Sequence, residues 1–152
     1  MEETRGPGAR DINMKIEIKR LNDAFHLEAS NEAGSRIQID AAPEVGGHNL
    51  GMRPMQLLLA GLGSCSAIDL IGILKKQKQD VQDIRITVTG EREKDKVPSL
   101  FTEAHVHFSL HGPIDPDKAA RAVVLAVEKY CSVAKTLEHN ARITHSFEII
   151  KP

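Results

Sequence analysis

The chain has 152 residues, a formal net charge of −1 and charges of both signs along its length. Balanced charge excludes the basic surface of a nucleic-acid-binding protein, and a chain with no tryptophan and one tyrosine offers little for base stacking. The length suits a single domain over residues 1–152. No N-terminal stretch has the basic and then apolar layout of a signal peptide, so we expect a cytoplasmic protein. In that reducing compartment the two cysteines are expected to be free thiols.

The N-terminal third predicts a tail and then three strands. Residues 1–12 lack apolar side chains to bury and are expected to be a disordered tail. Residues 14–19, 24–30 and 35–40 each alternate apolar and polar side chains, as half-buried strands do. Short polar turns separate them, which predicts an antiparallel meander. Residues 41–52 carry glycine and proline and predict a loop.

A long apolar helix is predicted over residues 53–78. Pro54 suits its first turn, where a missing N–H costs nothing. From residue 57 to residue 74 nearly every face is apolar, which is typical of a buried helix. Length alone does not separate a core helix from a membrane span. Three glycines, two serines and the charge of Asp69 favour the core of a soluble protein. We expect the small residues to let other backbones approach closely around Cys65.

The remainder of the chain predicts three strands and two helices. Alternation predicts the strands, and apolar residues at helical spacing predict the first helix. In chain order the segments are strand 84–93, strand 101–111, helix 118–130, helix 133–139 and strand 142–150. Asp115 and Pro116 are suited to the N-cap and first position of the helix. The order predicts an α+β fold with helices packed on antiparallel sheets.

Three histidines of the predicted strand 101–111 share one face, namely His105, His107 and His111. No carboxylate or cysteine completes a spaced ligand set around them, so we expect an ordinary strand face. We therefore predict no metal site and no bound cofactor.

The two cysteines are the candidates for chemistry. Cys65 lies in the middle of the apolar helix among small residues, and Cys131 lies at the end of the second predicted helix. Either thiol could simply be a small buried hydrophobe. Two thiols that meet are the minimum for a peroxidatic and a resolving cysteine. A helix C-terminus disfavours a thiolate at Cys131, so Cys65 is the better candidate nucleophile and needs a cation nearby.

The segments RPMQLLLAGLGSCSAIDLIGILKK and KYCSVAKTL resemble the two signature cysteine regions of the OsmC/Ohr family. The order of strands and helices fits as well, so the resemblance covers about residues 14–150. It implies an intertwined homodimer in which sheets wrap a long buried central helix, with two sites at the interface. It also implies that Cys65 attacks a small hydrophobic organic hydroperoxide and forms a sulfenic acid. Cys131 would then close a disulfide, which a cellular dithiol reduces without metal, flavin or haem.

The start of the helix departs from the family pattern. In the family's active peroxidases this helix opens Asn-Pro-Glu-Gln or similar, and the Glu orients an Arg beside the thiolate. Here Met55 occupies that place, and a thioether neither pairs with Arg nor accepts a hydrogen bond strongly. The sequence is more similar to the family's branch that reads Pro-Met-Glu or Pro-Met-Gln and then three leucines.

Three residues are candidates for stabilising the thiolate instead: Arg53, Arg20 and Gln56. Arg53 precedes Cys65 by twelve positions, about 18 Å along a straight helix at roughly 1.5 Å per residue. It would therefore have to act on a partner chain. Arg20 follows the first predicted strand, roughly where the family's arginine originates.

Two functions of different classes follow. The first is a thiol-dependent peroxidase of the oxidative-stress response that uses Cys65 and Cys131. The second is a dimeric protein that holds a small apolar or thiol-reactive molecule at Cys65 without turnover. Retention of both cysteines favours the peroxidase, and Met55 favours the binding protein. If both thiols only fill the core, they would be inert to alkylation in the native protein.

Overall fold

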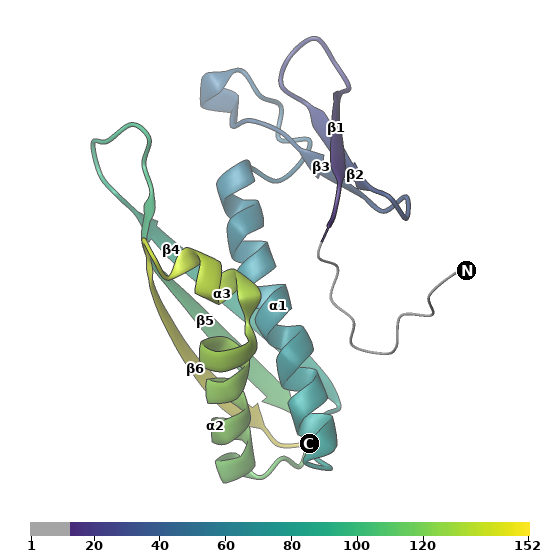
Figure 1. Cartoon of the computed structure of the whole chain (residues 1–152), viewed down its shortest axis with the longest axis vertical. Coiled ribbons are helices and arrows are strands. Elements are labelled where there is room, and N and C mark those ends of the chain that lie inside the picture. The colour runs from purple at the N-terminus through teal and green to yellow at the C-terminus, as the bar shows by residue number, and fades with distance from the viewer. Residues whose placement is uncertain (1–12) are drawn as a thin grey trace. The chain divides into compact units, whose positions relative to one another are not determined.

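A computed structural model describes residues 13–152, so the tail predicted for residues 1–12 lies outside the described residues. The chain divides into two compact units, residues 1–54 and residues 55–152. Each unit contains its own three-stranded sheet, and one long helix, α1, begins at Pro54 (Figure 1). The predicted α+β class is therefore confirmed, whereas the single domain stays a prediction.

The first unit contains the predicted meander. Strands β1 (Ile16–Arg20), β2 (Leu27–Asn31) and β3 (Arg36–Ile39) pair antiparallel in chain order. Ile18, Ala29 and Ile37 lie opposite one another across the three strands and form an apolar face. Ile18 and Ile37 remain exposed, so this sheet has apolar surface that its own unit leaves uncovered.

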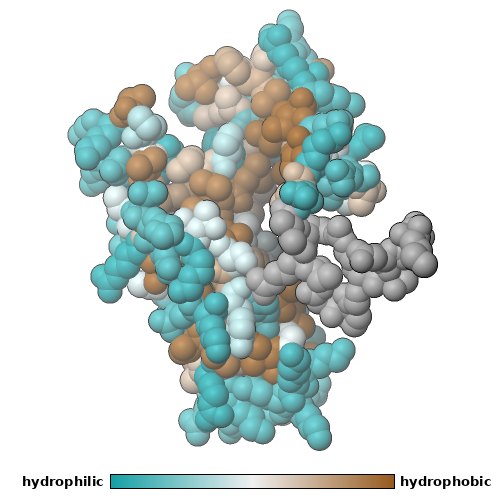
Figure 2. Space-filling view, viewed as in Figure 1, coloured by the Kyte–Doolittle hydropathy of each residue, from teal (hydrophilic) through white to brown (hydrophobic). Residues whose placement is uncertain are grey.

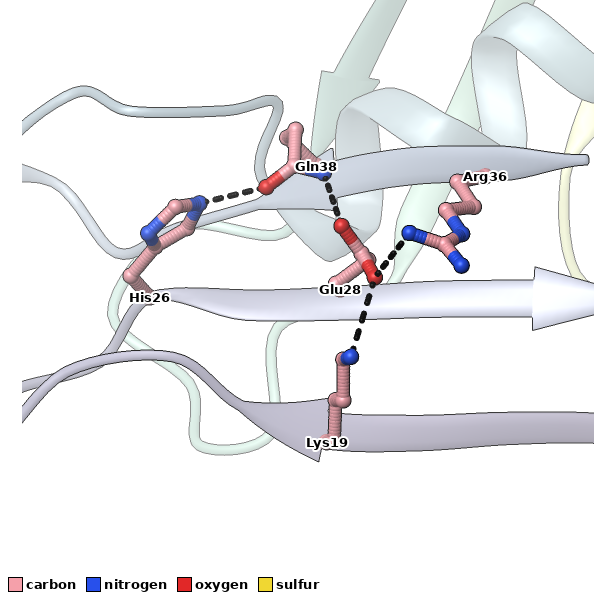
Figure 3. A network of polar contacts seen from close by, with 5 residues as sticks. All are labelled: Lys19, His26, Glu28, Arg36 and Gln38. Carbon is pink, nitrogen blue, oxygen red and sulfur yellow. Dashed lines mark hydrogen bonds and ion pairs between the residues drawn. The ribbon is translucent and has the colours of Figure 1, made fainter.

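The other face of the same sheet carries a polar network centred on Glu28 (Figure 3). Gln38 Nε2 donates a 2.8 Å hydrogen bond to Glu28 Oε2, and the other carboxylate oxygen lies 3.6 Å from Lys19 Nζ and 3.7 Å from Arg36 Nη1. His26 Nε2 lies 2.6 Å from Gln38 Oε1. The Gln38 hydrogen bond holds the pKa of Glu28 below its ordinary value, helped by the two cations and opposed by burial. The network joins all three strands in one register.

A buried carboxylate anchors the loop that follows β3. Asp40 is almost fully buried; its Oδ1 accepts the Ala41 N–H at 2.8 Å, and its Oδ2 accepts the N–H groups of His48 at 3.0 Å and Leu50 at 3.1 Å. The short helix η1 (Pro43–Val45) lies within the loop. Burial raises the pKa of Asp40, but the three backbone donors outweigh it, so the net pKa is below the ordinary value of 3.8. The predicted loop therefore has a defined internal anchor.

The second unit is a sheet covered by helices on one face. Its order is β4 (Asp83–Arg92), β5 (Phe101–His111) and β6 (Arg142–Ile150). Every inward side chain of β5 is buried, namely Phe101, Ala104, Val106, Phe108 and Leu110. The last four share one core with buried residues of α1 (Pro54–Lys76), α2 (Pro116–Val124), η2 (Leu125–Tyr130) and α3 (Ser132–Leu137). Helices α1 and α2 run over the same side of the sheet (Figure 1).

The prediction of purely antiparallel sheets is wrong for one strand pair. β4 and β5 are antiparallel, but β5 and β6 are parallel, with His107 opposite Ser146. Alternation identifies a strand but does not reveal the direction of its neighbour. A parallel neighbour requires a crossover connection, and residues 112–141, with α2, η2 and α3, form it.

The sheet of its own unit buries α1 on one side, and the helix wrapped on all sides is predicted for the dimer. Leu62, Leu70 and Leu74 are fully buried in the core of the unit, whereas Leu58 and Ile71 are exposed and Ile68 is 71% exposed. By length and composition alone, α1 would also qualify as a membrane span. The packing of its inner face against the sheet of its own unit supports the core-helix interpretation instead. A single sheet covers only one side of a helix.

We predict that Asp40→Asn destabilises the 41–52 loop, because an amide cannot accept from all three N–H groups as a carboxylate does. The folded pKa is lowered, so the carboxylate's stabilisation is full above pH 3.8 and disappears as the pH falls through the lower folded pKa. At neutral pH, hydrogen exchange at His48 and Leu50 should accelerate about tenfold. Glu44→Gln, an exposed change in the same loop, is the control and should leave exchange unchanged.

Candidate functional site

Cys65 lies at the border between the buried and exposed sides of α1. It is half-buried and packs against the edge of the core. Ser64 and Ile68 beside it are exposed, whereas Ser66 and Ala67 are buried. The thiol therefore stands where a small molecule or a second protein surface can reach it.

Gly63 lets α1 lie directly on β4 just before this thiol. A Cβ at Gly63 would stand 2.6 Å from Val88 Cγ2 and 3.4 Å from Ile86 Cγ2. A close approach near Cys65 is present here, but the atoms nearest to Gly63 belong to side chains of β4, whereas the sequence predicted neighbouring backbones. The glycine sets how closely the cysteine-bearing helix lies against the sheet.

Cys131 is fully buried at the junction of two helical segments. The helix predicted for residues 118–130 is α2 followed by the π-helical turn η2, so its end before Cys131 is confirmed but its regularity is not. Cys131 also opens α3, where its Sγ accepts the Ala134 N–H at 3.3 Å. The same sulfur lies 3.9 Å from the carbonyl oxygen of Leu62 on α1. The crossover thus carries Cys131 onto the helix that holds Cys65.

The second unit brings the two thiols together. Burial raises the pKa of Cys131, and the Cys65 thiol raises it further through a hydrogen bond and through charge. The Ser66 hydroxyl and the Ala134 N–H act in the opposite direction. Burial, which acts in the same direction as the helix-end position considered in the sequence, is the largest cause of the raised pKa. Cys131 is a protonated thiol at neutral pH beside a more accessible one.

The predicted thiolate-stabilising residues have defined positions. Arg20 closes its own turn, where Nε donates to the Ala24 carbonyl at 2.9 Å and Nη2 donates to that of Asp23. Arg53 Nη2 donates to Asn49 Oδ1 at 2.8 Å. Both arginines belong to the unit of residues 1–54, and Gln56 is exposed in the first turn of α1. A role for any of the three at the thiolate stays a prediction.

The histidine face of β5 is a hydrogen-bonded ladder. Ser146 Oγ lies 2.7 Å from both His105 Nε2 and His107 Nδ1, and Thr144 Oγ1 lies 2.6 Å from His105 Nδ1. Within residues 13–152, no three or more His, Cys, Asp or Glu side chains are grouped so as to hold a metal ion. The histidines join β5 to β6.

Sequence reasoning treated Ser66 only as a small residue. Its side chain is 0% exposed, and its Oγ has no hydrogen-bond partner. It is nevertheless close enough to Cys131 to lower the pKa of that thiol. Helical spacing could have identified it, because Ser66 lies four residues from both Leu62 and Leu70, on the core side of α1.

Comparison with known proteins identifies the family. Residues 47–146, which include both cysteines, match the family described as OsmC-like protein. The chain belongs to this family. It is 48% identical over 98 residues to protein YhfA of Escherichia coli K12. The matched region covers 64% of this chain and 72% of YhfA.

Solved structures also resemble this chain in fold. A hypothetical protein of Aquifex aeolicus is 30% identical, with a TM-score of 0.79 over 92% of this chain and 98% of that one. The organic hydroperoxide resistance protein OhrB of Bacillus subtilis is 20% identical, with a TM-score of 0.63 over 90% and 98% of the two chains. The second likeness is evidence of a common fold only.

We predict that Gly63→Ala destabilises the protein by about 1–3 kcal/mol, because the new methyl overlaps Val88. Gly72→Ala on the same helix is the control. It meets no atom within 4 Å and should stabilise the helix by about 0.5–1 kcal/mol. Urea denaturation monitored by circular dichroism measures both changes, and equal midpoints for the two variants would contradict the close packing.

Proposed function

We propose that the protein is a thiol peroxidase that reduces organic hydroperoxides through Cys65 and Cys131 in the oxidative-stress response. One observation carries the proposal: the half-buried Cys65 thiol lies beside the fully buried Cys131 thiol. A peroxidatic sulfur must be reached by its substrate, whereas a resolving sulfur only has to reach its partner. The fold shared with the hydroperoxide resistance protein OhrB supports the same assignment.

In the first step the Cys65 thiolate attacks the distal peroxide oxygen. The S–O bond forms as the O–O bond breaks, a proton is taken up by the departing alkoxide, and the products are Cys65 sulfenic acid and an alcohol. The apolar residues beside Cys65, such as Ile68, favour a small hydrophobic hydroperoxide.

In the second step Cys131 loses its proton and its sulfur attacks the sulfenic sulfur. The S–S bond forms, hydroxide leaves and becomes water with one proton, and Cys131 is joined to Cys65. A cellular dithiol restores both thiols by disulfide exchange. The cycle needs no metal or organic cofactor, and we propose that it runs in the reducing cytoplasm.

The first step also needs a group that stabilises the thiolate. Met55 cannot orient an arginine, so we propose that Arg53 or Arg20 acts directly, with Gln56 as an additional donor. The same Met55 supports the alternative, a dimeric protein that binds a small apolar molecule with weak or no turnover.

We expect the protein, incubated with cumene hydroperoxide and a dithiol, to turn over hydroperoxide. Cys65→Ser should remove at least about 99% of the rate, because it removes the nucleophile. Without the dithiol, Cys131→Ser should still form the Cys65 sulfenic acid with one equivalent of hydroperoxide, but no disulfide should follow. Peroxide consumption and thiol counting by mass spectrometry measure both results.

Arg53→Ala and Arg20→Ala assayed for the single-turnover rate identify the stabilising cation. Ligand binding without consumption in the parent protein would instead support the binding function. Two thiols that resist both peroxide and alkylation in the native protein would exclude the peroxidase function and indicate that the cysteines only fill the core.

We propose further that two copies of the chain form an intertwined homodimer. Two apolar surfaces are uncovered, the stripe of α1 at Leu58, Ile68 and Ile71 and the apolar face of the first sheet at Ile18 and Ile37. Figure 2 shows hydrophobic side chains reaching the surface among polar ones. Apolar surface of this kind in a charged, soluble chain favours association, and Cys65 lies beside the stripe.

We expect Ile68→Glu to weaken the dimer at least about tenfold, because it places an unpaired charge in an apolar contact. Val97→Glu is the control, since Val97 is a fully exposed apolar residue in the loop between β4 and β5. Sedimentation equilibrium measures both variants. A monomeric parent protein, or equal dissociation constants for the parent and Ile68→Glu, would contradict the proposal.

A further inference from the structure

A buried hydroxyl without a partner lies beside the buried thiol. The Ser66 side chain is 0% exposed and its Oγ makes no hydrogen bond. Burying a hydroxyl in this way costs free energy, so a partner is expected in some state of the protein. The Ser66 hydroxyl lowers the pKa of the neighbouring Cys131 thiol.

Two serines of the same helix behave differently. A helical serine commonly donates to the carbonyl four residues before it. Ser64 does so, with its Oγ 2.7 Å from the Ala60 carbonyl oxygen. Ser66 does not use the equivalent carbonyl of Leu62, which is instead 3.9 Å from Cys131 Sγ. The thiol therefore lies near the acceptor that the serine would otherwise use.

We propose that the Ser66 hydroxyl donates a hydrogen bond to the Cys131 thiolate and is a positioning residue for the disulfide-forming step. The inference rests on the proposed peroxidase function. While Cys131 is a thiol, its S–H points to the Leu62 carbonyl and Ser66 has no acceptor. Once the thiol loses its proton, the sulfur becomes an acceptor within reach of the serine, since a thiolate accepts hydrogen bonds and an S–H does so only weakly.

The hydroxyl acts on the second step alone. The oxidant is the organic hydroperoxide, which has already converted Cys65 to its sulfenic acid. Cys131 then gives up its proton, and the resulting thiolate forms the S–S bond as hydroxide leaves and takes up a proton to become water. Ser66 stabilises the thiolate and is neither oxidised nor deprotonated. Once the disulfide has formed, the Leu62 carbonyl is again available to Ser66.

Few other charged or titratable groups lie near the Cys131 thiol. The titratable group that faces Cys131 from α1 is the Cys65 thiol. On η2, Glu128, Lys129 and Tyr130 are exposed, and on α3 Lys135 is exposed. The Ala134 N–H and the Leu62 carbonyl, which also lie against the sulfur, do not titrate.

The test measures the titration of Cys131 directly. In a Cys65→Ala background Cys131 is the only thiol, and its ionisation is followed by the ultraviolet absorbance of the thiolate. Adding Ser66→Ala should raise the midpoint by about one pH unit, a tenfold loss of thiolate at neutral pH. Ser66→Thr retains a hydroxyl and should stay close to the background. Ser64→Ala is the matched control and should not move the midpoint.

In the protein with both cysteines, Ser66→Ala should slow disulfide formation about tenfold after one equivalent of cumene hydroperoxide. The rate at which Cys65 is oxidised should not change. An unchanged midpoint in Ser66→Ala, or equal shifts in Ser66→Ala and Ser66→Thr, would overturn the proposal. Failure of Cys65 to react with hydroperoxide would overturn the peroxidase function instead, and the Cys131 titration would still report on Ser66.

Discussion

The structure depends on a 23-residue apolar helix that the sheet of its own unit covers on one side only. The inner side of α1 lies against β4 and shares one core with β5, with Leu62 and Leu70 removed from water. The outer side keeps Ile68 exposed, and Cys65 lies at the boundary between the two. The exposed apolar stripe of α1 and the more accessible thiol, Cys65, therefore lie next to each other. The proposed dimer interface and the proposed chemistry therefore involve the same part of α1.

The parallel pairing of β5 and β6 is the second constraint. Parallel neighbours cannot be joined by a tight turn, so the chain must cross the covered face of the sheet. That crossover contains the π-helical turn before Cys131, a kind of turn often found at functional sites. The crossover that the parallel pairing requires therefore places the Cys131 sulfur beside α1.

The two sulfurs then differ because of their surroundings. Cys65 is half-buried beside exposed residues, whereas Cys131 is enclosed, and burial raises its pKa. Such a thiol is protected from solvent but is a poor nucleophile until something stabilises its charged form. Ser66 and the Ala134 N–H are the donors that lower the pKa of Cys131. The buried Ser66 hydroxyl therefore offsets part of the effect of burial on the pKa of Cys131.

Local patterns in the sequence determined much of the protein. Alternation identified all six strands, apolar spacing and Pro54 identified α1, and the two cysteine segments identified the family that the comparisons support. Only tertiary structure decided that β6 runs parallel to β5, that α1 is covered on one side, and that Ser66 is buried beside Cys131 without a partner. Periodicity reports which side of an element is apolar, because it depends on the geometry of a few neighbouring residues. The direction of a neighbouring strand and the meeting of distant side chains depend on the path of the whole chain, which no local pattern contains.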